Sequence, residues 1–424
     1  MEVLQDTYKD TKIGRIPKDW EVLQIKDIVT FEKSISYGVL KPGEYIPNGI
    51  PMIQIKDVKA NKVSVNDLHL ISEKLDEQYR RTKLKGGEIV ISLVGTIGKI
   101  AIIPKLLENG NIHRNLGLLR INSSKYVVDY IYNCLLSNGV QNRITSISVG
   151  STQALFNLGD LKKIRLPLPP LPEQQKIAAI LSTLDEQIST TDKIIEKSKE
   201  LKKGLMQKLF SEGIGHIEFK DTKIGRIPKD WEVRNLNKCC DINKDSLSSS
   251  TKEDYSFYYL DLSLVKKGII DFPNAKVDFK NAPSRARRKI KKGDILMSTV
   301  RPNLLGNGYI NFDSEEYIAS TGFAVLSNYK ETNGEFLYHY LYSHNMQSQI
   351  ERMLVGSSYP AINNKDVSIL KTPFPLIKEQ QKIASILSEA DAKIEKEQTQ
   401  KAQLQALKKG LMQQLLTGKK RVNV

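Results

Sequence analysis

With 424 residues, of which 40% are hydrophobic, the chain has enough apolar material for two or three folded domains, which excludes a disordered protein. The net charge of +16 and the pI near 9.4 favour a polyanionic partner such as nucleic acid, unless the whole proteome is basic. The three cysteines form no CxxC pair and no run reaches 18 apolar residues, so we expect no zinc site, no disulfide framework, no membrane span and a reducing, cytoplasmic location.

The chain opens on a segment that is repeated later. KDTKIGRIPKDWEV at 9–22 recurs unchanged at 220–233, which chance does not explain. Within it, Ile13 to Pro17 has the pattern of a turn that leads into a strand. Trp20 and Val22 then alternate with charged residues, as in a half-buried strand. Each copy is therefore predicted to open a globular domain.

The domain bodies match more weakly. KGGEIVIS at 85–92 aligns with KKGDILMS at 291–298, and both predict a glycine turn, a buried strand, a glycine-rich loop and a further strand. Near the domain ends, 150–175 aligns without gaps with 356–381, and prolines there stiffen the link to the next element. Between these landmarks the two copies share almost nothing, so the framework is duplicated while its surfaces have diverged.

A long amphipathic helix is predicted after each domain. EQQKIA opens both helices, and apolar residues of the first recur in steps of three and four. They are Ile177, Leu181, Leu184, Ile188, Ile195, Leu201, Leu205 and Leu209. A lone helix of roughly 57 Å cannot bury this stripe, so the two helices are predicted to pair as an antiparallel coiled coil. Gly204 and Gly410 lie within the helices and predict a close crossing or a break.

Together these patterns predict an α/β (α+β) chain with a pseudo-twofold internal repeat. Two globular strand-rich domains, 1–172 and 213–378, are separated by two long antiparallel helices, 173–212 and 379–424. The same connectivity predicts that the chain termini lie close together and that the domains lie at opposite ends of the helix pair.

Catalytic motifs are missing from the sequence. GTIGK at 95–99 lacks the spacing of a phosphate-binding loop and is better explained as a turn between strands. The five histidines show no metal-ligand spacing, and we recognise no nuclease carboxylate cluster. We therefore predict no catalytic residue, cofactor or metal, although a one-chain nuclease with an unrecognised site stays open as the alternative.

Basic and small polar residues near corresponding turns are the candidate DNA contacts. Cations suit phosphates, and small polar or amide side chains after a glycine suit base edges. Solvated loops and turn-capping serines are the structural alternatives. The candidates are Arg80, Arg81, Lys83, Lys99, Arg114, Ser151, Thr152, Gln153, Arg285, Arg287, Arg288, Arg301, Ser357, Ser358 and Tyr359.

These landmarks together resemble the specificity subunit of type I restriction–modification systems. The resemblance rests on IPKDWEV at 16–22 and 227–233, on the KGGEIVIS and KKGDILMS segments, and on PLPPLPEQQKIAAIL at 167–181 with PFPLIKEQQKIASIL at 373–387. It covers nearly the whole chain. It implies that each domain is a target recognition domain that reads one half of a split, asymmetric site in double-stranded DNA, and that the helices are spacers.

The resemblance also implies the partners. Modification subunits carry the methyltransferase chemistry, and restriction subunits carry ATP-driven translocation and cleavage, so this subunit itself is not an enzyme. Because the EQQ motifs are identical, we predict that two modification subunits dock beside them. The candidate partner-binding residues are Glu173, Gln174, Gln175, Glu379, Gln380 and Gln381.

Overall fold

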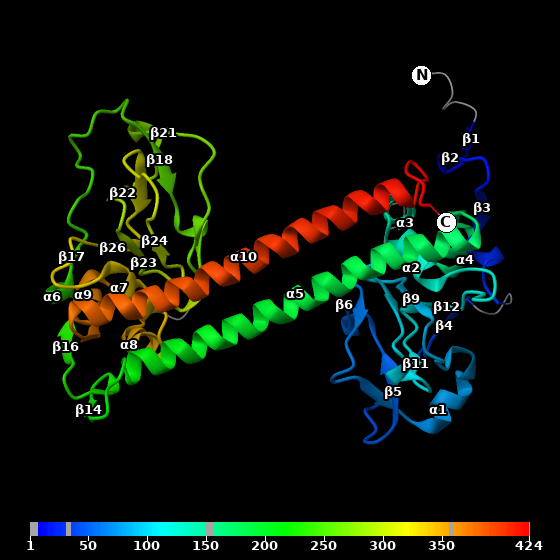
Figure 1. Ribbon diagram of the computed structural model, residues 1–424, viewed down its shortest axis with the longest axis horizontal. Coiled ribbons are helices and arrows are strands. Elements are labelled where there is room, and N and C mark those ends of the chain that lie inside the picture. The colour runs from blue at the N-terminus through cyan, green and yellow to red at the C-terminus, as the bar shows by residue number, and fades with distance from the viewer. Residues whose placement is uncertain (1–6, 31–34, 149–155, 356–359, 424) are drawn as a thin grey trace. The chain divides into compact units, whose positions relative to one another are not determined.

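The computed structural model describes residues 7–30, 35–148, 156–355 and 360–423. They form two compact units: unit 1 is Met1–Asp192 with Gln400–Val424, and unit 2 is Lys193–Thr399. Two long helices, α5 (Leu171–Ser211) and α10 (Ile377–Leu415), each contribute one part to either unit (Figure 1). The predicted domain boundaries at 172 and 378 lie at the starts of the long helices, whereas the two compact units divide within them. The predicted boundaries stay a prediction.

Unit 1 is built on a four-stranded antiparallel sheet in the order β10–β9–β12–β4. Its strands are β10 (Ile100–Ile102), β9 (Ile89–Ser92), β12 (Leu116–Leu119) and β4 (Ile35–Tyr37). All residues of β9 and β12 are buried, which is why the strand after the KGG turn reads as a continuous apolar run. A second sheet has the order β11–β5–β8, with β11 (Asn111–Ile112), β5 (Ile50–Ile53) and β8 (His69–Ile71).

Short elements complete unit 1. A small hairpin joins β6 (Val58–Lys59) to β7 (Lys62–Val63). The helices are α1 (Glu73–Gln78), α2 (Val128–Leu136), α3 (Asn138–Ser148) and α4 (Leu158–Lys163), and the 3₁₀ turns are η2 (Ile25–Asp27), η4 (Ile55–Asp57), η5 (Arg80–Thr82) and η6 (Lys105–Leu107). Ser72 caps α1 by accepting a hydrogen bond from the Leu75 backbone N–H, and Asn157 caps α4 in the same way through Asp160.

Unit 2 has two four-stranded sheets. The first, in the order β17–β26–β23–β24, consists of β17 (Asp241–Ile242), β26 (Phe323–Ser327), β23 (Ile295–Ser298) and β24 (Gly308–Tyr309). The second, in the order β21–β18–β25–β22, consists of β21 (Val277–Asp278), β18 (Ser256–Leu260), β25 (Tyr317–Ser320) and β22 (Ala286–Lys289). Strands β21, β18 and β25 of this sheet pair in the same order and directions as β8, β5 and β11 of unit 1, and β22 is an added fourth strand.

The remaining elements of unit 2 are short. A hairpin joins β19 (Val265–Lys266) to β20 (Ile269–Ile270). The helices are α6 (Leu236–Cys239), α7 (Gly334–Leu341), α8 (His344–Met353) and α9 (Asn364–Ile369), and the 3₁₀ turns are η7 (Leu262–Leu264), η8 (Phe279–Asn281) and η9 (Pro302–Leu304).

The duplicated sequence forms the same strands in both units. The hairpin of β1 (Tyr8–Thr11) and β2 (Gly14–Pro17) corresponds to that of β14 (Phe219–Thr222) and β15 (Gly225–Pro228). The next strand, β3 (Glu21–Gln24) or β16 (Glu232–Asn235), pairs with the proline-rich strand that precedes the long helix, β13 (Arg165–Leu168) or β27 (Lys371–Phe374). The predicted internal repeat of two strand-rich domains with long helices is confirmed.

Both long helices belong to the cores of the units. In unit 1, Ile177 and Leu181 of α5 lie in one apolar cluster with Leu415 of α10 and Leu416 just after it. In unit 2 the roles are exchanged: Ile383 and Leu387 of α10 lie with Leu209 and Phe210 of α5. The helix ends are therefore held by the domain cores, which is a stronger anchor than helix propensity alone.

Charged pairs set the antiparallel register of the helices. In unit 1, Lys408 Nζ lies 2.6 Å from Asp185 Oδ2, and Lys401 contacts Asp192. The residue numbers rise along α5 and fall by the same amount along α10, as in an antiparallel pair. In unit 2, Lys202 makes the equivalent contact with Asp391. These half-exposed pairs contribute little net stability, on the order of 0–1 kcal/mol each, but they disfavour other registers.

Two details of the predicted helices are wrong. Leu201 belongs to the apolar stripe in the sequence but is 61% exposed, whereas Ile177, Leu181, Leu184, Ile195 and Leu209 are buried. A Cβ atom added at Gly204 or Gly410 would meet nothing within 4 Å, and both helices run through these positions. The glycines therefore mark neither a close crossing nor a break, and we find no packing reason for them.

A carboxylate near the start of each long helix ties that helix to one copy of the duplicated IPKDW segment. Glu173, which is 2% exposed, accepts a hydrogen bond from Trp20 Nε1 at 3.1 Å and two from the Arg421 guanidinium at 2.7 and 2.8 Å. Arg421 also contacts Asp19, and these two carboxylates hold the pKa of its guanidinium above the usual value. We call Trp20, Glu173 and Arg421 the clasp of unit 1.

Unit 2 repeats the clasp with a histidine in the place of the arginine. Glu379 accepts from Trp231 Nε1 at 3.0 Å and from the Ile214 backbone N–H at 2.9 Å, and it contacts His216 Nε2 at 3.0 Å. His216 lies in the link after α5, as Arg421 lies in the tail after α10. In unit 1 this tail also reaches the start of the chain, where Tyr8 Oη donates to the Gly418 carbonyl at 3.0 Å. The predicted proximity of the two terminal segments is confirmed within unit 1.

Glu173→Ala is expected to destabilise unit 1 by about 2–4 kcal/mol, because it leaves a buried indole N–H without an acceptor and removes the partner of Arg421. The measurement is urea unfolding followed by tryptophan fluorescence in a Trp231→Phe background, where only Trp20 reports. The exposed neighbour Gln175, changed to Ala, is the control and should shift stability by less than about 0.5 kcal/mol. Equal effects of the two variants would contradict the role of the clasp.

A buried histidine in unit 2 makes stability depend on pH. His339 of α7 is 2% exposed, and burial, with Lys202 nearby, lowers its pKa to about 3. Its Nε2 lies 3.0 Å from Ser388 Oγ, while Nδ1 lies 3.7 Å from Asp391, beyond hydrogen-bond distance. Because the unfolded chain binds this proton near pH 6.5, stability present above that pH is lost as the pH falls towards 3.

We expect unit 2 to lose about 2 kcal/mol through His339 between pH 7.5 and pH 5, since each pH unit below 6.5 costs about 1.4 kcal/mol. His339→Gln should remove this part of the pH dependence. Urea unfolding at both pH values in a Trp20→Phe background, with Trp231 as the reporter, measures it. An unchanged pH dependence in His339→Gln would show that other groups carry it.

Candidate nucleic-acid interface

A loop after a buried central strand lies at the same place in both units. In unit 1 it follows β9, and the Phe156 N–H donates to the Leu93 carbonyl at 3.0 Å. In unit 2 it follows β23, and the Ile362 N–H donates to the Thr299 carbonyl at 2.9 Å. We call this shared contact the framework bond. It holds the loop against the segment that precedes α4 or α9, where the sequence predicts base-reading residues.

Six of the predicted base contacts cannot be placed. Ser151, Thr152, Gln153, Ser357, Ser358 and Tyr359 lie outside the described residues. The described residues on their C-terminal side, Phe156 and Ile362, are the donors of the framework bonds. These two donors therefore lie next to the loops after β9 and β23. In each unit the donor and the loop are separated by about 60 residues of chain, so the sequence alone does not reveal that they are close.

The loop after β9 is the GTIGK turn, and Lys99 closes it. Ser92 Oγ accepts a hydrogen bond from the Lys99 N–H at 2.8 Å and donates to the Thr96 carbonyl, while Gly95 and Gly98 have positive φ angles. The interpretation as a turn between strands agrees with this geometry. In unit 2, the corresponding loop carries Arg301, which is exposed and also has a positive φ.

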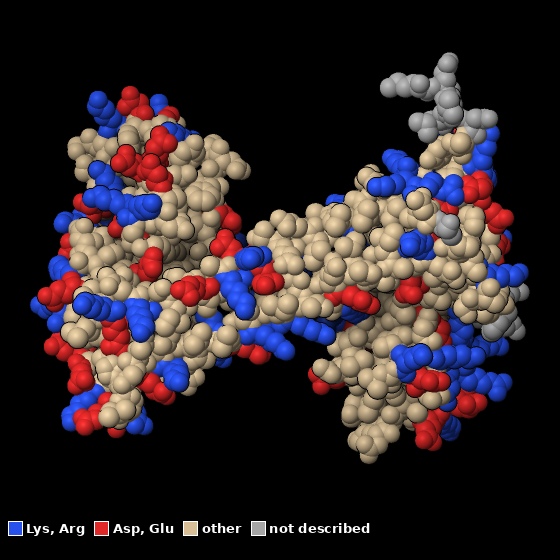
Figure 2. Space-filling view, viewed as in Figure 1, with Lys and Arg blue, Asp and Glu red and all other residues tan. Residues whose placement is uncertain are grey.

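The first basic cluster consists of Arg80, Arg81, Lys83 and Lys85, and it borders a hollow of about 380 Å³ next to η5. Arg80, Lys83, Lys85 and Arg120 line it together with Glu108. Figure 2 shows Lys and Arg gathered beside α1 on this face, with acidic residues among them. Arg80 is exposed and lies 3.7 Å from Glu77, and Arg81 is exposed as well. Lys83 is tied to the buried Asp76 at 3.3 Å, so it serves the fold as well as the surface.

Arg120 shapes this cluster and was not predicted. Its Nη1 donates to the Arg81 carbonyl at 2.7 Å, its Nη2 donates to the Lys83 carbonyl at 2.6 Å, and its Nε lies 3.4 Å from the buried Glu88. The arginine therefore fixes the backbone from which Arg81 and Lys83 project. No sequence signal relates it to them, because it follows β12, far along the chain.

The second basic cluster consists of Arg285, Arg287 and Arg288, and two of these arginines make contacts inside unit 2. Arg287 lies over the Phe279 ring at 4.5 Å. Arg288 donates to Ser246 Oγ at 3.1 Å, and burial lowers the pKa of its guanidinium. Arg285 precedes β22 and is exposed. The structure thus separates three neighbours that the sequence treats alike, and it leaves Arg285 the most accessible of them.

Arg114 lies in the turn between β11 and β12, outside the cluster that surrounds η5. Its side chain is exposed, and its backbone N–H donates to the Val39 carbonyl at 2.9 Å, which joins this turn to the chain after β4. Its assignment as a DNA contact stays a prediction.

The first two residues of each EQQ motif have internal partners. Besides the clasp carboxylates, Gln174 accepts from the Val127 N–H at 3.1 Å and donates to the Pro169 carbonyl at 2.9 Å. Gln380 does the same with Asn333 and Pro375. The third residues, Gln175 and Gln381, are exposed. Binding of a partner by these motifs stays a prediction. Gln175 and Gln381 are the residues of the motifs that a partner could reach.

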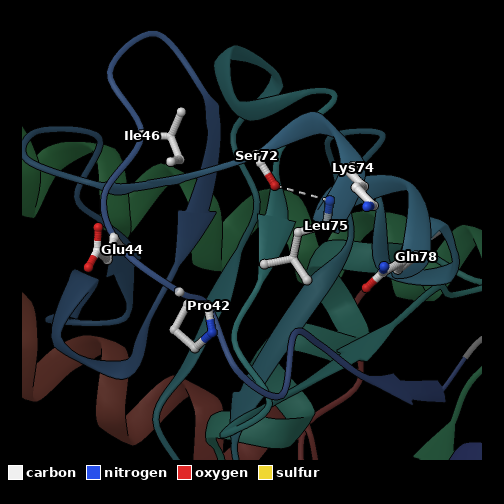
Figure 3. A pocket seen from close by; sticks show the side chains of 8 residues that line it. Pro42, Glu44, Ile46, Ser72, Lys74, Leu75 and Gln78 are labelled. Carbon is white, nitrogen blue, oxygen red and sulfur yellow. Dashed lines mark hydrogen bonds between the residues drawn. The ribbon is translucent and has the colours of Figure 1, made fainter.

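A second hollow is lined by none of the predicted contact residues. This hollow of about 260 Å³ lies between the 42–46 loop and the start of α1. Figure 3 shows Pro42, Ile46 and Leu75 around it, with Ser72 engaged as the cap of α1. Across the described ranges, no three His, Cys, Asp or Glu side chains are grouped as metal ligands, and no helix is both long and apolar enough to cross a membrane.

Comparison with known proteins identifies the family. The model of the type I restriction modification DNA specificity domain matches residues 17–200 and 228–406. The putative type I restriction enzyme MjaX specificity subunit of Methanocaldococcus jannaschii is 33% identical, covering 99% of this chain and 97% of the relative. The MjaVIII specificity subunit of the same organism is 28% identical over 99% of this chain and 97% of the relative.

Solved structures show the same fold. The type I restriction–modification S subunit from M. genitalium aligns with a TM-score of 0.57 at 16% identity, covering 94% of this chain and 96% of that one. A chain from a structural study of complex assembly in the type I R-M system aligns with a TM-score of 0.55, also at 16% identity, covering 95% and 99%. With two family matches and full-length relatives, this chain belongs to the specificity subunits of type I restriction enzymes.

Proposed function

We propose that this chain is the non-catalytic DNA-reading subunit of a type I restriction–modification complex, and that each strand-rich domain reads one half of a bipartite, asymmetric site. The observation that carries the proposal is the duplicated framework with unlike surfaces. The tryptophan–glutamate hydrogen bond of the clasp, the framework bond and the buried central strand are the same in both units. The residues on the corresponding sheets differ, and unit 2 adds the strand β22, as two readers of different half-sites require.

The partners follow from the same proposal. Two modification subunits bind, one near each EQQ motif, and restriction subunits join through the assembled complex. Exposed Gln175 and Gln381 support a docking role for the two equivalent helix starts. The reading domains span 1–172 and 213–378, with 173–212 and 379–424 as spacer helices, and the complex acts on DNA in the cytoplasm. The chain supplies recognition, while its partners supply methylation and cleavage.

Exchange of one domain body tests the division of labour. Residues 23–150 are replaced by the matching segment of a relative, which keeps Trp20, Glu173 and Arg421 and therefore the clasp of unit 1. The complex is co-expressed with its modification subunits and its methylome is sequenced. We expect one half of the methylated site to change and the other to stay.

The matched control replaces 234–355 and should change only the other half. A result in which either exchange alters both halves would show that the domains are not separate readers. Methylation by this chain with only S-adenosylmethionine added would overturn the non-catalytic assignment.

Arg80→Gln and Arg81→Gln test the phosphate contacts. Each is expected to weaken binding to all DNA sequences alike and to lower the slope of log K against log salt by about 1, because one counterion-releasing contact is lost. The recognised bases should not change. Titrations of the complex at several salt concentrations measure this, with Lys125→Gln, an exposed lysine outside the predicted set, as the control. An unaltered slope in both arginine variants would remove η5 from the interface.

A further inference from the structure

The loop after β23 has two residues in an unfavourable backbone conformation. Arg301 has φ 47° and Leu305 has φ 57°, and they flank η9. In the corresponding loop of unit 1, the positive φ angles belong to Gly95 at 78° and Gly98 at 82°. Glycine adopts this left-handed region freely, whereas an L residue with a Cβ is strained there.

The two loops match at both ends, and the loop of unit 2 is one residue longer. The framework bonds fix the same alignment before the loop, so Gly95 corresponds to Arg301. After the loop, the pairing of β24 with β23 is shifted by one residue relative to that of β10 with β9, so Gly98 corresponds to Leu305. The fold therefore requires a left-handed backbone at both positions, and unit 1 meets the requirement with the residue that suits it.

The two strained side chains of unit 2 have different surroundings. Leu305 is half-buried, and its carbonyl accepts a hydrogen bond from the Lys267 N–H at 3.0 Å. Arg301 is exposed. Its own backbone is pinned, because its N–H donates to the Pro360 carbonyl at 2.7 Å and Pro302 after it is buried. The side chain thus leaves the loop from a rigid, strained point next to Pro360.

We propose that Arg301 reads a guanine of the second half-site through a bidentate contact to O6 and N7. The inference rests on the proposed function and assigns one base-reading residue within it. Backbone strain of this kind clusters at functional sites, and of the two strained residues in this loop Arg301 is the exposed one. Glycine at this position would relieve the strain at no cost to the turn. A phosphate contact tolerates a flexible cation, whereas a guanidinium fork needs a fixed origin to match two acceptors on one base.

Methylome sequencing of the co-expressed complex carrying Arg301→Gly tests the proposal. We expect one guanine position in the second half-site to become degenerate, with discrimination at that position falling about 5- to 150-fold and the first half-site unchanged. The melting temperature should stay within about 2 °C, because relief of strain and the added freedom of the unfolded chain oppose each other.

Two further variants separate base reading from other roles. Arg301→Lys keeps the charge but not the fork, so the salt dependence should persist while discrimination falls. Leu305→Gly relieves the other strained position and should leave the recognised bases unchanged. Binding to oligonucleotides with 7-deazaguanine at each second-half guanine should then be weakened at one position in the wild type and at none in Arg301→Gly.

The outcomes are distinct. A wild-type complex that methylates no bipartite site would refute the proposed function itself. A bipartite site whose second half survives Arg301→Gly intact, or contains no guanine on either strand, would overturn the role of Arg301 alone. A uniform loss of binding with a lower salt slope would identify a phosphate contact and likewise overturn the proposal.

Discussion

One carboxylate at the start of each long helix, buried in Glu173 and partly buried in Glu379, organises the chain. Glu173 and Glu379 each accept the indole N–H of a tryptophan from the duplicated IPKDW segment. Each also contacts an arginine or a histidine in the segment that follows the other long helix. A buried charge is tolerated only with such partners, so the helix start, the domain start and the segment after a helix are held as one unit. The identical sequences at these places follow from this shared requirement.

The two clasps are not chemically equal. In unit 1 the third member is an arginine, whose guanidinium carries a permanent charge, and in unit 2 it is a histidine. Both residues lie in the segment that follows a long helix. The arginine belongs to the tail after α10, and the histidine belongs to the link between α5 and the second domain. The duplicated chain has thus kept one geometry with two kinds of side chain at the third position.

Some of the basic residues make contacts within the protein, and others are exposed at its surface. Arg120, Arg421 and Lys408 are engaged with backbone carbonyls or carboxylates inside unit 1, so they add to the net charge without being offered fully to a partner. Arg80, Arg81 and Arg301 are exposed. A count of basic residues therefore overstates the cationic interface, and contact geometry is needed to select its members.

The sequence by itself determined the repeat, the long helices, the buried strand after each KGG or KKG turn and the family. Each depends on local spacing or on identity between copies, such as EQQKIA after a proline-rich strand. The apolar stripe was only partly right, because Leu201 is exposed where no core lies over it. Periodicity identifies the face of a helix but not how far along that face the partner extends.

Only the tertiary structure decided which polar residues are internal. Glu173 and Gln174 appear as a surface motif in the sequence, yet their partners Trp20, Arg421 and Val127 come from distant parts of the chain. The same holds for the strain at Arg301, which becomes visible only when its φ angle is set beside that of Gly95. Such properties arise from long-range contacts and backbone geometry, which composition and spacing do not encode residue by residue.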